Sequence, residues 1–262
     1  MTLKISVIIP AYNDLEAVLT CLNSIQHYAA DNSNIEYIVQ DDAGQKVNYA
    51  AFIPPASASV QRNPVNLGFP GNCNAGAARA HGDIYLHLNQ DTYAVEQLSR
   101  GWDNALRRAF EDPQVGVVGA RLLFPDGRVQ SIGGAYDLFG QPFHLMLGAQ
   151  DLTHQKIAEP AERSWVTAGA IASRAWLWQE VGGFNVEYAG GYFEDVEYCC
   201  EVRERGMKIM YEPGCTFIHK VGTTGGNPRF GQNAMIFKRR WVDTRRVPIG
   251  EVPNVMERFW AR

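Results

Sequence analysis

The sequence predicts an α/β protein with a doubly wound, mostly parallel sheet. Short apolar runs, typical of buried parallel strands, alternate with segments of helical apolar spacing through about residue 111. Hydrophobic residues make up 46% of the 262 residues, which is enough for a substantial core and excludes a chain that is disordered throughout. No internal repeat and no low-complexity linker interrupts the chain, so we expect a single domain with a less regular C-terminal portion.

The elements of the first half follow from local patterns. Pro10 ends the first apolar run, and apolar residues recur at helical spacing directly after it. An alanine-rich stretch after Gly71 marks a second helix. In chain order we predict strand 5–9, helix 15–27, strand 35–39, strand 60–62, helix 72–80, strand 84–88 and helix 96–110.

The second half has a less regular pattern. Residues 131–163 are rich in glycine and are predicted to form a loop, and Gly206 has the position of a helix C-cap. The predicted strands cover residues 115–118, 121–124, 129–130, 165–172, 208–211 and 216–218, and the predicted helices cover 176–181 and 195–205.

Charge and cysteine content exclude several classes of protein. The net charge of -4 argues against a nucleic acid partner. The number of cysteines, five, is odd, and no two of them form a CxxC pair. This pattern indicates neither a disulfide framework nor a zinc site, and it favours a reduced, cytoplasmic compartment. The apolar run at residues 5–9 is too short for a signal peptide, and no run reaches the roughly 18 apolar residues of a membrane span.

Polar residues cluster where four predicted strands end. In a doubly wound sheet, ligands bind outside the carboxyl ends of the strands. We therefore expect one ligand-binding edge. The clusters are Pro10-Ala11-Tyr12-Asn13-Asp14, Asp41-Asp42, residues 63–66 and Asn89-Gln90-Asp91.

Each cluster has a functional and a purely structural interpretation. Asp91 can bind a divalent cation that bridges diphosphate oxygens, or it can cap the next helix. Asp42 can accept a hydrogen bond from a nucleobase or ribose, or it can close a solvated turn. Tyr12 can pack on a base or be an exposed loop residue. The glycine- and asparagine-rich segment 66–76, which includes Asn66 and Asn74, can bind an anion through its N–H groups or can serve only tight turns.

Two further features carry chemistry in the second half. Glu194 and Asp195 begin a predicted helix, where acids stabilise the helix dipole or where one of them acts as a general base. His219 follows a strand-like run and is either a metal ligand or a structural histidine.

Taken together, these segments resemble an inverting glycosyltransferase of family 2 with the GT-A fold. The resemblance covers about residues 4–220, and its overall pattern is nearest to bacterial rhamnosyl- and related cell-surface polysaccharide transferases. It is carried by Ser6 to Asn13, Val39 to Gly44, Asn66 to Gly76 with Gly82-Asp83, Leu88-Asn89-Gln90-Asp91-Thr92, Gly182-Gly183-Phe184, Phe193 to Glu197, and Arg203, Gly206 and His219.

The resemblance implies a role for each of these residues. Asp91 and His219 would hold Mg²⁺ or Mn²⁺ against the donor diphosphate, with Asn89 near the ribose or the metal. Asp195 would be the base and Glu194 its neighbour and the alternative base. The donor-binding residues would be Pro10, Ala11, Tyr12, Asp14, Asp42, Asn66, Asn74, Asn89, Gln90 and Asp91, and Trp165, Gly169 and Ala170 would shape the sugar and acceptor pocket.

The implied substrates are a nucleoside-diphosphate sugar, either dTDP-rhamnose or a UDP-hexose, and a saccharide or lipid-linked saccharide acceptor. The implied division of the single domain, 1–262, is a nucleotide-binding half at 1–111, an acceptor and catalytic half at 112–220, and a loop and tail at 221–262. The loop at 222–228 is expected to close over the donor, with Arg229 or Lys238 near the phosphates. The basic and aromatic tail is expected to contact the inner face of a membrane, to form a homodimer contact, or to be solvated.

Two rival functions stay open at this point. A sugar-nucleotide nucleotidyltransferase would need a glycine-rich N-terminal loop with Arg and Lys, which residues 10–14 do not supply. A non-catalytic sugar-nucleotide or glycan-binding module would have no need of Asp91, Asp195 and His219 together.

Overall fold

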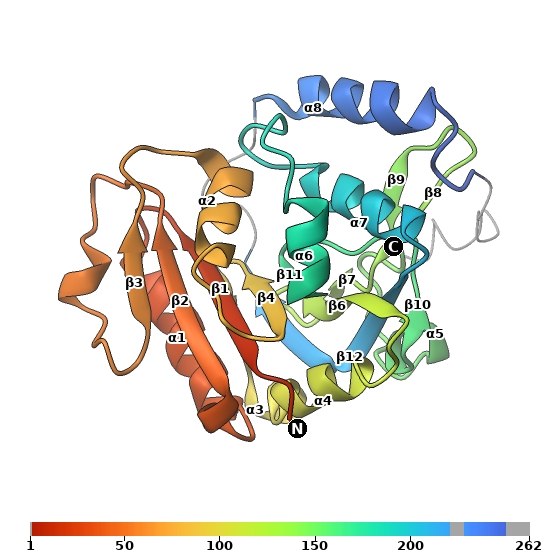
Figure 1. Ribbon diagram of the computed structural model, residues 1–262. Helices are drawn as coiled ribbons and strands as arrows, with labels where there is room; N and C mark the ends of the chain where they lie inside the picture. The colour runs from red at the N-terminus through yellow and green to blue at the C-terminus, as the bar shows by residue number, and fades with distance from the viewer. Residues whose placement is uncertain (1, 221–227, 250–262) are drawn as a thin grey trace.

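The computed structural model describes residues 2–220 and 228–249 (Figure 1). The strands are β1 (Ile5–Ala11), β2 (Ile35–Asp41), β3 (Ser59–Arg62), β4 (Ile84–Leu88), β5 (Thr92–Tyr93), β6 (Val115–Leu123), β7 (Val129–Ser131), β8 (Gly134–Tyr136), β9 (Pro142–His144), β10 (Ala161–Glu162), β11 (Ala170–Arg174) and β12 (Lys208–His219). The helices are α1 (Leu15–Tyr28), α2 (Gly68–Ala77), α3 (Glu96–Ser99), α4 (Trp102–Ala109), α5 (Gln155–Ala158), α6 (Ala175–Val181), α7 (Glu194–Glu204) and α8 (Phe230–Phe237), with short turns η1 (Asn32–Asn34), η2 (Tyr49–Ala51) and η3 (Lys238–Val242).

One mixed sheet runs through both halves of the chain. Among the described residues it has ten strands, eight of them in the order β10-β12-β6-β11-β4-β1-β2-β3. The first half is parallel, as predicted, with β1 between β2 and β4. The second half departs from the mostly parallel pattern because β11 enters antiparallel between β4 and β6. This places β11 directly beside the carboxyl end of β4.

Helices cover both faces of the sheet (Figure 1). Alternate residues of β1 point to opposite faces, as the two-residue period of a strand requires. Val7 and Ile9 pack with α1 and α4 on one face, whereas Ile8 packs with α2, α6 and α7 on the other. Both faces of β1 are therefore buried, which explains why the sequence of this strand is a continuous apolar run.

Several predicted elements differ from the observed ones. The helix predicted at 96–110 is two helices, because Gly101 adopts a left-handed φ of 74° between them. The strands predicted at 115–118 and 121–124 are one strand, β6, and those at 208–211 and 216–218 are one strand, β12, with an irregular register after Glu212. The segment predicted as a loop at 131–163 contains β8, β9, α5 and β10, which are too short to leave a periodic pattern.

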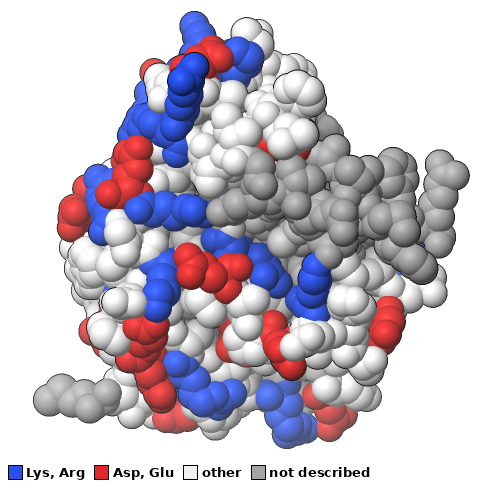
Figure 2. Space-filling view, turned by 90° about the vertical axis from the view of Figure 1, so that its right-hand side faces the viewer, with Lys and Arg blue, Asp and Glu red and all other residues white. Residues whose placement is uncertain are grey.

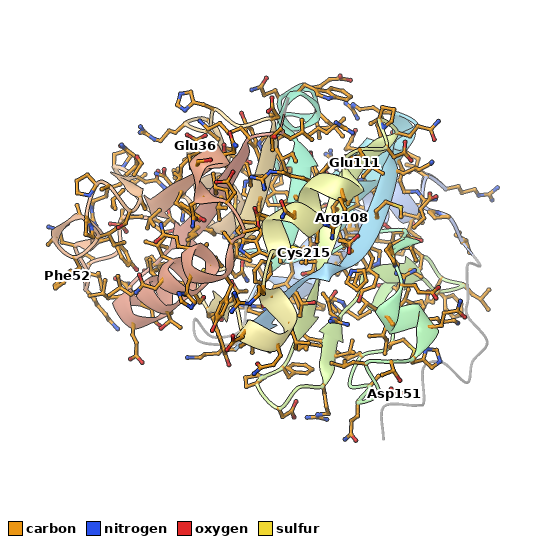
Figure 3. All side chains as sticks on the ribbon, turned by 90° about the horizontal axis from the view of Figure 1, so that it is seen from below. Glu36, Phe52, Arg108, Glu111, Asp151 and Cys215 are labelled. Carbon is orange, nitrogen blue, oxygen red and sulfur yellow. The ribbon has the colours of Figure 1, made fainter. Side chains whose placement is uncertain are left out.

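The surface and the cysteines add two observations. Lys and Arg side chains are interspersed with Asp and Glu on the face shown in Figure 2. All five cysteines are buried free thiols; Cys215 on β12 lies in the interior, whereas Phe52 and Asp151 lie at the periphery (Figure 3). In the described part of the chain, no helix combines the length and the apolar character needed to cross a membrane.

Candidate functional site

Hydrogen bonds join the carboxyl ends of three parallel strands. The Asp42 N–H donates to the Ala11 carbonyl at 2.9 Å, which ties the end of β2 to the end of β1. The Gln90 side chain accepts from the Tyr12 N–H at 2.8 Å and donates to the Tyr12 carbonyl at 3.2 Å, which ties the turn after β4 to β1. The polar clusters predicted to share one edge of the sheet therefore do lie together.

Asp42 is a buried and oriented carboxylate. Its Oδ1 accepts from Asn63 Nδ2 at 2.9 Å and from the Leu67 N–H at 2.7 Å. The neighbouring Asp41 pairs instead with Arg62 and accepts from the Gly44 N–H at 3.1 Å. Asp41 thus closes the turn, whereas the Asp42 carboxylate is held at the edge where a ligand would bind.

The other predicted donor-binding residues make local contacts. Asp14 caps α1 by accepting from the Ala17 N–H at 3.0 Å, and Asn66 accepts from the Gly68 N–H at 3.0 Å. The Asn74 amide donates to and accepts from the Phe184 backbone at 2.7 and 2.9 Å, which ties α2 to the loop after α6. Tyr12 is 42% exposed at the edge of the sheet, whereas Pro10 and Ala11 are buried in β1.

Asp91 and His219 meet although they lie 128 positions apart in the sequence. The antiparallel pairing of β12 with β5 places His219 opposite Thr92, and His219 Nε2 lies 3.0 Å from Asp91 Oδ1. Asn89 Nδ2 lies 3.2 Å from the same ring nitrogen. The structure therefore brings together Asp91 and His219, the two expected metal ligands, and Asn89, which was expected near the ribose or the metal.

Gln130 on β7 completes this group and was missed by the sequence analysis. Its Oε1 lies 2.6 Å from His219 Nδ1, and its Nε2 donates to the His219 carbonyl at 3.2 Å. An amide oxygen can only accept, so Nδ1 is the donor in this contact, and Nε2 is the ring nitrogen that faces Asp91. No sequence signal links Gln130 to His219, because 89 residues separate them.

The residues present suit a divalent cation. His219 Nε2 and the Asp91 carboxylate lie 3.0 Å apart, and imidazole nitrogen and carboxylate oxygen are both common ligands of divalent cations. The Asn89 Oδ1 atom is buried without a hydrogen-bond partner in the described part of the molecule. The described part of the chain contains no group of three His, Cys, Asp or Glu side chains that could bind a metal by itself. Substrate oxygens would therefore have to complete the coordination.

The adjacent acids at the start of α7 have different surroundings. Asp195 accepts from the Ala168 N–H at 2.9 Å and from the Val196 N–H at 2.8 Å. Burial raises the pKa of Asp195, and these hydrogen bonds partly oppose the increase. Burial, followed by the nearby Asp195 charge, raises the pKa of Glu194 well above its ordinary value, and Glu194 Oε2 has no partner among the described residues. Asp195 is thus the better stabilised carboxylate.

A single backbone segment connects the acids to the Asp91–His219 pair. Ala168 donates its N–H to Asp195, and the next carbonyl, that of Gly169, accepts from the Asn89 N–H at 3.1 Å. A Cβ atom on Gly169 would lie 3.5 Å from the His219 ring. Ala168 and Gly169 therefore connect the two centres through the backbone, and Ala170, the next residue, pairs with Leu88 at the end of β4. Trp165 is 4% exposed, and its indole N–H donates to the Ala135 carbonyl at 3.2 Å.

The C-terminal segment is bound to α7 through Glu197, a residue of the Phe193 to Glu197 segment to which the sequence gave no role of its own. Glu197 is buried and accepts from Asn185 at 2.9 Å, Arg240 at 3.0 Å, Trp241 at 2.8 Å and the Tyr188 hydroxyl. Arg240 and Trp241, in the tail predicted to contact a membrane or a second copy, therefore make their hydrogen bonds within the molecule. Arg246 likewise pairs with Glu204, and Lys238 pairs with Asp243.

Two expectations for the C-terminal region fall wholly or largely outside the described residues. The loop predicted to close over the donor, at 222–228, overlaps the undescribed residues 221–227, and Phe259 and Trp260 lie in the undescribed residues 250–262.

The sequence is similar to several known proteins. It is 26% identical over 252 residues to the uncharacterized protein y4gI of Sinorhizobium fredii, covering 90% of this chain and 27% of that protein. It is 25% identical to the O-antigen biosynthesis protein RfbC of Myxococcus xanthus, covering 83% of this chain and 17% of that protein. It is 26% identical to the pre-mycofactocin glycosyltransferase of Mycobacterium tuberculosis, covering 82% of this chain and 42% of that protein. The chain thus spans less than half the length of each of these relatives.

Solved structures with the same fold come from glycosyltransferases. The fold matches GalNAc-T7 with UDP, GalNAc and Mn²⁺ at a TM-score of 0.74 and 17% identity, covering 92% of this chain and 49% of that one. It matches the mannosyltransferase PcManGT from Pyrobaculum calidifontis, in complex with GDP-Man and Mn²⁺, at a TM-score of 0.61 and 17% identity, covering 86% and 59%. These matches identify the predicted GT-A fold.

The family follows from the sequence itself. The model of the family described as Glycosyl transferase family 2 matches residues 6–147, which is more than half of the chain. This range includes the ends of β1, β2 and β4 and the Asn89-Gln90-Asp91 turn. The chain therefore belongs to glycosyl transferase family 2.

Proposed function

We propose that this protein is a metal-dependent inverting glycosyltransferase. It would move a sugar from a nucleoside-diphosphate sugar, dTDP-rhamnose or a UDP-hexose, to a hydroxyl of a saccharide or lipid-linked saccharide in cell-surface polysaccharide synthesis. The proposal is supported by the backbone at Ala168 and Gly169, where one N–H donates to Asp195 and the next carbonyl accepts from Asn89, beside the Asp91–His219 pair. A base and a diphosphate-binding centre on either side of one pocket are what sugar transfer requires.

The nucleotide would bind along the ends of β1, β2 and β4. The buried Asp42 carboxylate is placed to accept a hydrogen bond from the base or ribose, and Tyr12 is exposed enough to pack on a base. Asp91 and His219 would hold Mg²⁺ or Mn²⁺, which offsets charge on the leaving diphosphate when it is bound. Two solved structures of the same fold contain UDP or GDP-Man together with Mn²⁺, which supports this assignment.

Asp195 would accept the proton of the acceptor hydroxyl. The hydroxyl oxygen forms a bond to the anomeric carbon while the bond from that carbon to the diphosphate oxygen breaks, so the configuration inverts. The N–H groups of Ala168 and Val196 orient the Asp195 carboxylate. Glu194 Oε2 has no hydrogen-bond partner in the described structure, and burial and the nearby Asp195 raise the pKa of Glu194 well above its ordinary value, so Glu194 is the weaker candidate for an ionised base.

The proposal is tested by measuring nucleoside diphosphate release from a panel of UDP-, dTDP- and GDP-sugars with nitrophenyl glycosides as acceptors. Asp195→Asn should lower kcat by about 100-fold or more, which is the usual contribution of a general base. Glu201→Gln is the matched control because Glu201 lies on the same helix and, among the described residues, forms its ion pair with Arg205 near the surface. Turnover of the Asp195→Asn variant at the wild-type rate would refute the assignment of the base.

The stereochemistry and the metal need separate measurements. The anomeric configuration of the product, read by NMR, should be opposite to that of the donor, and retention would contradict single displacement. A thermal-shift panel of UDP, dTDP and GDP, each with and without Mn²⁺, should identify the nucleobase of the donor. A nucleotide should raise the melting temperature more when Mn²⁺ is present. The metal would tighten nucleotide binding, and tighter binding to the folded state stabilises it further.

A further inference from the structure

The four residues before Glu194 form an unusual turn. Gly190, Gly191, Tyr192 and Phe193 all have left-handed backbone conformations, with φ values of 79°, 95°, 70° and 75°. The left-handed region is open to glycine but disfavours residues with a Cβ atom, and large aromatic residues occupy it rarely. Such conformations persist only when the surrounding structure enforces them, and they concentrate at functional sites.

One side chain from a distant helix holds this turn. Asn233 on α8 is 1% exposed, and its Nδ2 donates to the Gly191 carbonyl at 2.7 Å. The same nitrogen lies 3.3 Å from the Ala189 carbonyl and 3.4 Å from the Tyr192 carbonyl. The NH₂ group thus has two hydrogens for three nearby carbonyls, two of the turn and one directly before it, and its short hydrogen bond is to Gly191.

Helix α8 lies beside the turn and packs against it (Figure 1). The Phe193 ring lies 5.4 Å from that of Phe230 and 5.6 Å from that of Phe237, at either end of α8. Beyond α8, Trp241 donates to Glu197 one turn into α7. Asn233 is therefore carried on an element with a defined position relative to Glu194 and Asp195.

We infer that Asn233 is a positioning residue, which holds the left-handed turn 190–193 so that α7 begins at Glu194 with the Asp195 carboxylate directed at the Ala168 N–H. The inference rests on the proposed function, because it assigns Asn233 to the presentation of the proposed base. Release of the turn toward ordinary negative φ values would rotate the start of α7. A displacement of about 1 Å at a reacting group can lower the rate about 100-fold.

The decisive variant is Asn233→Asp, which replaces the donor NH₂ by an acceptor oxygen of nearly the same size. Gln232→Glu is the matched control, because it makes the same change of atoms one residue earlier on an exposed side chain. We expect Asn233→Asp to lower kcat about 10- to 100-fold and to leave KM for the donor within about twofold, because Tyr12, Asp42 and Asp91 follow β1, β2 and β4 and belong to other segments than the turn. Gln232→Glu should have wild-type constants. Asn233→Ser, which adds no charge, serves if the aspartate variant does not fold.

A second readout does not depend on activity. Chymotrypsin cleaves after aromatic residues, so cleavage after Tyr192 and Phe193 and hydrogen exchange at residues 190–194 report on the turn. Both should increase at least about tenfold in Asn233→Asp and should stay unchanged in Gln232→Glu. Unchanged protection, or lost protection with a wild-type kcat, would overturn the inference. If the wild type transfers no sugar while the variant loses protection, the proposed function fails and the structural role of Asn233 stands.

Discussion

Replacing Glu197 by glutamine tests whether α7 and the C-terminal segment depend on one buried carboxylate. Glu197 is 3% exposed, and its Oε2 accepts from Trp241 Nε1 at 2.8 Å, from Arg240 Nε at 3.0 Å and from the Tyr188 hydroxyl, while Oε1 accepts from Asn185 Nδ2 at 2.9 Å. A glutamine amide keeps only one oxygen. Its NH₂ group must then face either the Asn185 amide or the three groups that donate to Oε2 in the wild type.

The magnitude follows from these contacts. A hydrogen bond to a charged group contributes about 1.5–3 kcal/mol, and a buried donor left without an acceptor costs about 1–3 kcal/mol. The arrangement that loses least turns the glutamine NH₂ toward Asn185 and leaves neutral hydrogen bonds to Trp241 and Tyr188. The Arg240 side chain is 44% exposed, so its ion pair is screened and adds little. We expect Glu197→Gln to lower the free energy of unfolding by about 2–4 kcal/mol.

The assay is urea unfolding at neutral pH, followed by tryptophan fluorescence. With a slope of about 3 kcal/mol per molar urea, the midpoint should fall by about 1 M. Glu201→Gln is the control, because it breaks a partly exposed ion pair with Arg205 four residues away, which contributes only about 0.3–0.5 kcal/mol. If the two variants unfold within about 0.5 kcal/mol of each other, the reasoning about the buried site is wrong.

Two further predictions concern the metal centre and the acid pair. Gln130→Leu removes the acceptor of His219 Nδ1, so Mn²⁺ affinity measured by calorimetry with UDP present should fall about 10- to 100-fold; an effect equal to that of the exposed Gln97→Leu would contradict this. Because burial raises the folded-state pKa of Glu194 above its ordinary value of 4.5, the wild type loses stability as the pH rises from that value through the folded pKa. Glu194→Gln should therefore melt at a higher temperature than the wild type at pH 8 and lose this advantage at pH 4; a difference independent of pH would exclude the carboxylate as its cause.

Much of the first half could be predicted because its signals are local. The apolar run of β1 is continuous because both faces of that strand are buried, and the boundaries of β4 were predicted without error. The carboxyl ends of neighbouring parallel strands lie at one edge of a sheet by geometry alone, so the grouping of Asp42 with Asn89, Gln90 and Asp91 needed no coordinates.

Local signals also have limits, which the second half illustrates. The register irregularity of β12 made one strand look like two, and the short strands of residues 131–163 have too few residues for a period. The antiparallel entry of β11 depends on its neighbours in space, β4 and β6, rather than on its own residues.

By itself the sequence determined the fold class and the family, and it suggested Asp91, Asp195 and His219 as candidate site residues, because residue types in a given order record the chemistry of a site. The tertiary structure alone decided which side chains support them. Gln130 reaches His219 across 89 residues, and Asn233 reaches Gly191 across 42, through hydrogen bonds whose partners have no fixed spacing along the chain. Directional contacts of this kind exist only once the sheet has brought distant segments together, so no periodicity or local motif could reveal them.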